Sequence, residues 1–91
     1  MTLRITRSAD RPEVLKLTGR IRSRDLTEVK AEMRREHKVS AIDIEEVTLV
    51  DLDAVRFLAS CEQAGVEVVN GSAYIRDWVA REKKFLEEKG E

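Results

Sequence analysis

The chain has 91 residues, of which 17 are basic, 18 are acidic and 42% are apolar. This length excludes a second folded domain, so we expect a single domain over residues 1–91, ordered from about 2 to 86 and frayed at its C-terminal end. A net charge of −1 lacks the basic excess that contact with many phosphates requires. We therefore expect no nucleic-acid partner.

Cysteine content and hydropathy bear on the compartment. Cys61 is the single cysteine of the sequence, so no intrachain disulfide can form, and no Cys/His spacing indicates a zinc site. No apolar run approaches the roughly 18 residues of a membrane span, and residues 1–4 lack the apolar core of a signal peptide. We expect a cytoplasmic protein that is not inserted into a membrane.

Two stretches near the N-terminus alternate between apolar and polar residues. Residues 3–7 and 15–18 have this alternation, and residues 8–12 between them supply Ser, Asp and Pro. The pattern predicts a β-hairpin whose second strand is broken by Gly19.

Helical spacing follows the hairpin. Ser23 or Asp25 is a candidate cap, and the apolar residues after it recur three and four positions apart as far as Glu36 and His37. This predicts a first helix with a narrow apolar stripe formed by Leu26, Val29 and Met33.

The β-branched stretch at residues 39–44 predicts a third strand, which we expect to end in an acidic loop. Oxygen ligands suit Mg²⁺ or Ca²⁺, so carboxylates of this loop and of the next helix could form a small-ligand or cation site. No motif enforces that geometry, and clustered acids on loops are usually solvated. A small-ligand or cation site ranks third among the functional hypotheses, behind the two protein-binding roles described below, and we expect no metal or cofactor. The residues of this possible site are Asp43, Glu45, Glu46, Asp51 and Asp53.

Three further elements complete the chain. Apolar residues spaced three and four apart predict a second helix from Asp53 to Gly65, and residues 66–69 predict a fourth strand. Residues 70–72 provide a turn and a cap for a third helix that ends near Glu88. Its apolar stripe comprises Ile75, Trp78, Val79, Phe85 and Leu86.

The predicted order β-β-α-β-α-β-α defines an α/β fold with a four-stranded mixed sheet. Right-handed crossovers place the first two helices on the same face of the sheet. The strands alternate between apolar and polar residues, whereas a sheet covered on both faces has continuous apolar strands. We therefore expect the helices mainly on one face, with the opposite face wet or used by a partner.

Residues 40–58 resemble the STAS domain, which is shared by bacterial anti-sigma factor antagonists and the cytoplasmic ends of sulfate transporters. In that family a strand ends in Asp, and Asp-Ser-Ser-Gly opens the following helix. Asp43 matches the strand-end Asp and Asp51 matches the first motif residue, while Leu52-Asp53-Ala54 replaces Ser-Ser-Gly. Gly19 and residues 65–79 extend the resemblance over nearly the whole chain.

The resemblance implies a STAS-like fold and a non-enzymatic protein-interaction module in a partner-switching pathway, bound to an anti-sigma factor with serine-kinase activity. The family's antagonists are switched by phosphorylation of a serine at the position of Asp53. A carboxylate there imitates a phosphate only in part, so the switch would be absent or frozen. From the residues alone, Asp53 either caps the second helix or lies in its first turn. The expected partner-binding residues are Asp51, Leu52, Asp53, Ala54 and Arg56.

The resemblance also allows a second role, that of a structural STAS subunit of a bacterial lipid-transporting ABC complex, bound to its ATPase. The missing phosphoacceptor favours this alternative.

Three other positions remain. Phe85 and Leu86 lie at the end of a helix that a small sheet is too short to cover, so they either pack in the core or form a homodimer or partner contact. Cys61 lies on an apolar stripe and is expected to be a small buried residue. His37 has no nucleophile motif beside it, and no glycine motif for phosphate is present, so we expect no enzymatic activity.

Overall fold

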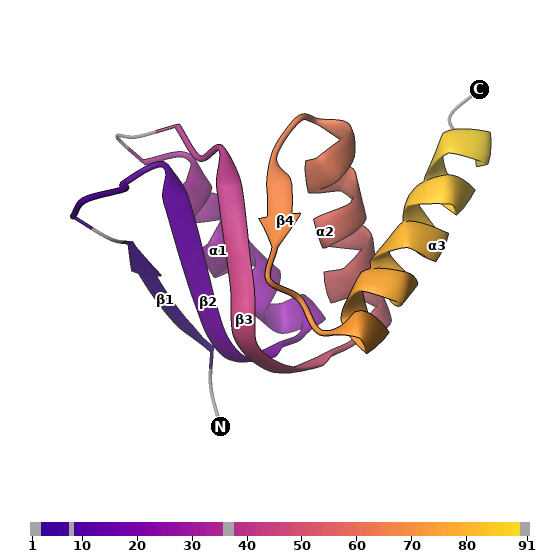
Figure 1. The fold of residues 1–91 in the computed structure, drawn as a ribbon, viewed down its shortest axis with the longest axis horizontal. Helices are drawn as coiled ribbons and strands as arrows, with labels where there is room; N and C mark the ends of the chain where they lie inside the picture. Colours follow the sequence, from indigo (N-terminus) through magenta and orange to yellow (C-terminus); the bar gives the residue numbers. More distant parts are fainter. Residues whose placement is uncertain (1–2, 8, 36–37, 90–91) are drawn as a thin grey trace.

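A computed structural model describes residues 3–7, 9–35 and 38–89 (Figure 1). Over these residues the fold is α/β, with a four-stranded mixed sheet in the order β1-β2-β3-β4. The second strand pairs antiparallel with the first and parallel with the third, which pairs parallel with the fourth. The strands are β1 (Arg4–Arg7), β2 (Val14–Ile21), β3 (Ala41–Val50) and β4 (Glu67–Val69).

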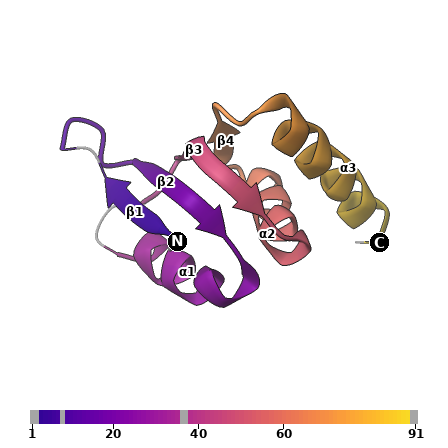
Figure 2. The ribbon, with the colours of Figure 1, turned by 90° about the horizontal axis from the view of Figure 1, so that it is seen from below.

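The helices follow the predicted order. They are α1 (Leu26–Met33), which a short 3₁₀ helix η1 (Ser23–Asp25) precedes, α2 (Leu52–Gln63) and α3 (Ala73–Lys89). Figure 2 shows α1 and α2 on one side of the sheet, whereas α3 lies against α2 beyond β4. The described residues place no helix on the opposite side of the sheet. The predicted four-stranded mixed sheet and the predicted order of strands and helices are confirmed.

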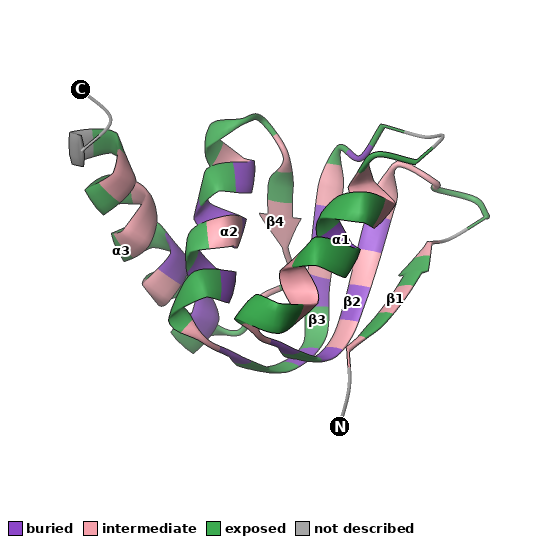
Figure 3. Ribbon diagram, turned by 180° about the vertical axis from the view of Figure 1, so that it is seen from behind, coloured by how far each residue is buried: buried purple, intermediate pink, exposed green. Residues whose placement is uncertain are grey.

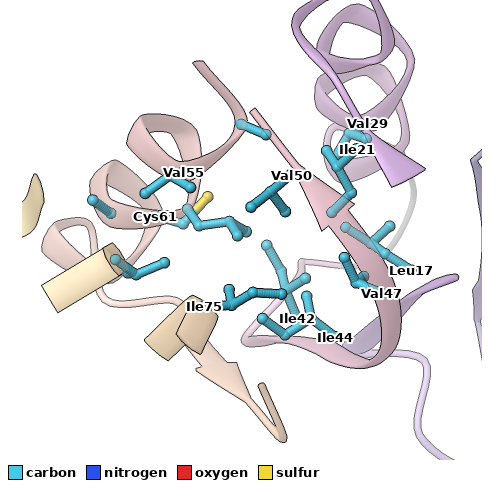
Figure 4. Packing of buried hydrophobic residues seen from close by; sticks show 14 of the residues in the cluster. Leu17, Ile21, Val29, Ile42, Ile44, Val47, Val50, Val55, Cys61 and Ile75 are labelled. Carbon is cyan, nitrogen blue, oxygen red and sulfur yellow. The ribbon is translucent and has the colours of Figure 1, made fainter. Parts of the chain in front are cut away.

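The core lies between the sheet and α1 and α2, with one edge closed by α3 (Figures 3 and 4). Alternate residues of β2 enter it, because side chains on a strand point to opposite faces in turn. Hydrophobic burial of this aliphatic set is the main driving force for the fold. The largest fully buried side chains are Leu15, Leu17, Ile21, Val29, Ile42, Ile44, Val55 and Leu58.

The third strand does not end at Ile44, and the acidic loop predicted there does not exist. β3 continues to Val50, so Glu45 and Glu46 belong to the strand. Its register with β2 shifts twice, each time with one extra residue in β3. These bulges change the spacing of the buried residues from two to three, and a rule based on strict alternation therefore ends the strand too early. The buried residues of β3 are Ile42, Ile44, Val47 and Val50.

The second strand also continues past its predicted end. Gly19 is a residue of β2 with φ of 100°, paired with Val47 of the bulged β3. The Thr48 hydroxyl donates a hydrogen bond of 3.2 Å to the Gly19 carbonyl. A residue with a side chain rarely adopts this positive φ, so Gly19 lets the strand follow the bulge instead of ending it.

The ends of the helices differ from prediction in detail. Ser23 and Asp25 form η1, and α1 starts one residue later, with Asp25 at its N-cap position but without a side-chain hydrogen bond to the helix. The predicted end at residues 36–37 lies outside the described residues. Ser72 accepts a hydrogen bond from the Ile75 amide, as expected of a cap for α3. This helix extends to Lys89, past residue 86.

Candidate functional site

The N-terminus of α2 is fixed by Asp51. This residue has extended backbone angles, and its Oδ1 accepts a 2.9 Å hydrogen bond from the Ala54 amide. Its Oδ2 accepts a second bond of 2.9 Å from the Ser23 amide at the start of η1. Asp51 is therefore the cap of α2 and also joins the two helical segments that follow β2 and β3.

The other residues of the predicted motif occupy the first turn of α2 in different environments. Leu52 is 42% exposed and Asp53 is exposed, so both side chains are accessible to a partner. Asp53 does not cap the helix but adds a negative charge to its first turn, where the helix dipole favours one. Ala54 is fully buried. Its predicted contact with a partner is not supported, because helical geometry turns its side chain into the core.

Arg56 connects α2 with α3. Its Nε lies 3.1 Å from Oε1 of Glu82, and its guanidinium lies 5.7 Å from the centre of the Phe85 ring. Phe85 is 43% exposed, whereas Leu86 is partly buried and packs against the core. The two regions predicted separately from the sequence thus adjoin one another. We call the exposed residues here, together with Phe57 beside them, the α2 surface: Leu52, Asp53, Arg56, Phe57 and Phe85.

A groove of about 530 Å³ lies beside these residues, between α1 and α2. Phe57 lies in its wall, and Nζ of Lys30 on α1 lies 5.8 Å from the centre of the Phe57 ring. The sequence alone does not predict this groove, because the periodicity of one helix does not identify the helix that packs beside it. The polar residue Ser60, three positions after Phe57, is a weak indication in the sequence that this side of α2 faces away from the core, and in the structure Ser60 is exposed. The groove is lined by Ser23, Leu26, Thr27, Lys30, Asp53, Arg56, Phe57 and Ser60.

The thiol of Cys61 is protected by burial. Cys61 is 6% exposed, which confirms the prediction of a small buried residue. Burial raises the pKa of its thiol to about 11, while Lys30 lowers this pKa and Glu62 raises it. The thiolate required of a nucleophile is therefore scarce at neutral pH.

The acidic residues proposed as a cation site are not brought together. Among the described residues, which include all five of them, no three His, Cys, Asp or Glu side chains form a group that could hold a metal ion. The Asp43 Oδ1 instead accepts a hydrogen bond from the Glu45 amide at the first bulge. Asp51 is engaged with two backbone amides.

Comparison with known proteins adds no assignment. No protein-family model, curated protein or solved structure matches this chain.

None of the helices within residues 3–7, 9–35 and 38–89 has the length and apolar character needed to cross a membrane.

Proposed function

We propose that this protein is a non-enzymatic interaction module with a STAS-like fold, which binds an anti-sigma-factor-like regulator with serine-kinase activity through the α2 surface. The sheet order and the placement of the α2 N-terminus at the end of β3 are compatible with the resemblance seen in residues 40–58. Asp43 departs from the family pattern, because it lies within β3 and not at its end. Binding of this kind belongs to a partner-switching pathway in the cytoplasm.

The observation that carries the proposal is an exposed surface on a rigid support. Leu52 and Phe85 are two of the few large apolar side chains left exposed among the described residues, and Arg56 lies beside the Phe85 ring. Aromatic and arginine side chains supply most of the binding energy at protein interfaces. The cap formed by Asp51 fixes this surface before a partner arrives, which lowers the entropic cost of binding.

The charge of Asp53 defines the proposed state of the switch. Its carboxylate is permanent and lies in the first turn of α2, where a phosphate on a serine would carry about −1.5 to −2. The module therefore holds one binding state, partly similar to the phosphorylated one, and does not alternate between two.

A second candidate is the structural subunit of an ABC-type lipid transport complex, bound to the transporter ATPase. The observation that favours it is the absence of a hydroxyl group from residues 51–54, so that the exposed turn has no group for a kinase to modify. Both candidates use the α2 surface, and they differ in the partner.

Asp53→Ser tests the proposed switch position. We expect the variant to be phosphorylated by the partner kinase, as measured by mass spectrometry. Its affinity should change at least about tenfold on phosphorylation, with the phosphorylated form closer to the native protein, as measured by isothermal titration calorimetry. Glu28→Ser on the exposed side of α1 is the matched control and should remain unmodified. Unchanged affinity and no phosphorylation in Asp53→Ser would remove the switch role from this position.

A further inference from the structure

The sheet has a face that no described helix covers, on the side toward the viewer in Figure 1. Since the buried residues of β2 face the core, the residues that alternate with them point outward. We call this outward side the open face. Pairing across the sheet extends it to the other strands. Its central residues are Thr6, Val14, Lys16, Thr18, Ala41 and Asp43.

Charges on the open face are separated by sign. The register places Lys16 beside Asp43, and it places Thr18 between Arg4 on β1 and Glu46 on β3. Among the described residues that the register assigns to this face, the positive charges lie on β1 and β2 and the negative charges on β3 and β4. The positive residues are Arg4, Lys16 and Arg20, and the negative residues are Asp43, Glu46 and Glu67.

We propose that the open face binds a second copy of this chain. A two-fold axis parallel to the strands places β2 over β3 of the second copy, so each positive half meets a negative half. An axis across the strands would instead place like charges together, which costs free energy. The separation of charge thus favours an isologous dimer in one orientation.

The centre of the open face suits close approach of two sheets. In this orientation Lys16 and Asp43 of one copy meet Asp43 and Lys16 of the other, in an arrangement of alternating sign. The neighbouring side chains are small or aliphatic, as at Val14, Thr18 and Ala41, so sheets can pack at a spacing of about 10 Å. Lys16 is already oriented toward β3, with its Nζ 3.5 Å from Oε2 of Glu46.

The area of the open face limits the affinity expected of the dimer. The strands have 4, 8, 10 and 3 residues, and each residue covers about 3.3 Å by 4.8 Å of sheet, giving roughly 400 Å² per copy. The total of about 800 Å² lies below the usual size of stable specific interfaces, so the dimer is weak and reversible. Its formation does not involve the α2 surface and is independent of the proposed function.

Sedimentation equilibrium tests the dimer directly. We expect a monomer–dimer equilibrium whose dissociation constant rises at least about tenfold from 0.1 M to 1 M NaCl, because the Debye length falls from about 10 Å to about 3 Å. A protein that stays monomeric at millimolar concentration, or a dimer insensitive to salt, would overturn the proposal.

Charge reversal tests the orientation. Lys16→Glu and Asp43→Lys should each dimerise at least about tenfold more weakly than the native protein, and an equimolar mixture should form a heterodimer. Lys84→Glu and Glu28→Lys make the same charge changes on exposed helix positions and should leave dimerisation unchanged. A mixture of folded variants that stays monomeric would contradict the proposal, with folding checked by circular dichroism.

A measurement on the native protein covers the case in which a variant does not fold. Dilution of isotope-labelled protein should shift the amide signals of Lys16, Asp43 and their strand neighbours. Shifts confined to the helices would overturn the assignment to the open face.

Discussion

At the scale of single residues, Asp51 has the largest structural role at the candidate site. Its two carboxylate oxygens accept hydrogen bonds from the amides of Ala54 and Ser23, which belong to different helical segments. The sequence offers two aspartates, Asp51 and Asp53, for one cap, and either is chemically suitable. Which aspartate caps α2 depends on the residue at which β3 ends, and the two bulges in β3 change that residue.

Asp51→Ala should lower the free energy of unfolding by about 1–2 kcal/mol, because it removes the cap of α2 and leaves the Ser23 amide without its acceptor. Urea denaturation measures this loss. Asp53→Ala is the control, with an expected loss of about 0.3–1 kcal/mol from the dipole interaction alone. Equal losses in the two variants would contradict the assignment of the cap.

Cys61 links stability to alkaline pH. The pKa of its thiol is raised by burial from about 9 to about 11. Between these pH values the folded state keeps the thiol proton while the unfolded state loses it. The corresponding stability is fully present below pH 9 and is lost as the pH rises through 11. Thermal unfolding between pH 8 and 11 should therefore show a steeper loss in the native protein than in Cys61→Ala. The same slope in both would contradict the account.

At the scale of elements, the helices were easier to predict than the middle strands. The stripe from Ala54 to Cys61 predicts α2 nearly to its ends, because each residue interacts with neighbours three and four positions away. β3 depends instead on its partner: two extra residues opposite β2 alter which side chains enter the core. The pairing that decides this lies between distant parts of the chain, so alternation within residues 41–50 could not reveal it.

A substitution at Gly19 tests the pairing of β2 with β3. Gly19→Ala should lower the free energy of unfolding by about 1–3 kcal/mol, because a residue with a Cβ is strained at a φ of 100°. Thr18→Ala, one position earlier on the open face, should cost less because its backbone needs no positive φ. Denaturant titration distinguishes them, and a neutral Gly19→Ala would contradict the bulged register.

At the scale of the whole molecule, the fold separates two surfaces. The α2 surface lies on the helical side, and the open face lies on the other side of the sheet (Figures 1 and 3). The resemblance in residues 40–58 points to the start of α2 as a binding site, but it does not indicate that Phe85 adjoins it. That adjacency arises from the packing of α3 on α2, through the contact of Arg56 with Glu82. A dimer formed through the open face would leave two α2 surfaces accessible.

The central claim is that the α2 surface binds a protein partner. Affinity purification from the native host, quantified by mass spectrometry, compares the native protein with the double variant Leu52→Gln, Phe85→Ser. Tyr74→Ser is the matched control, because Tyr74 is 67% exposed and lies outside the α2 surface.

We predict that a kinase-like regulator, or a transporter ATPase under the second candidate, is recovered with the native protein and with Tyr74→Ser. Its recovery should fall at least about tenfold with the double variant, since the variant removes apolar area that a partner would bury. Equal recovery with all three proteins, each shown to be folded, would contradict the claim.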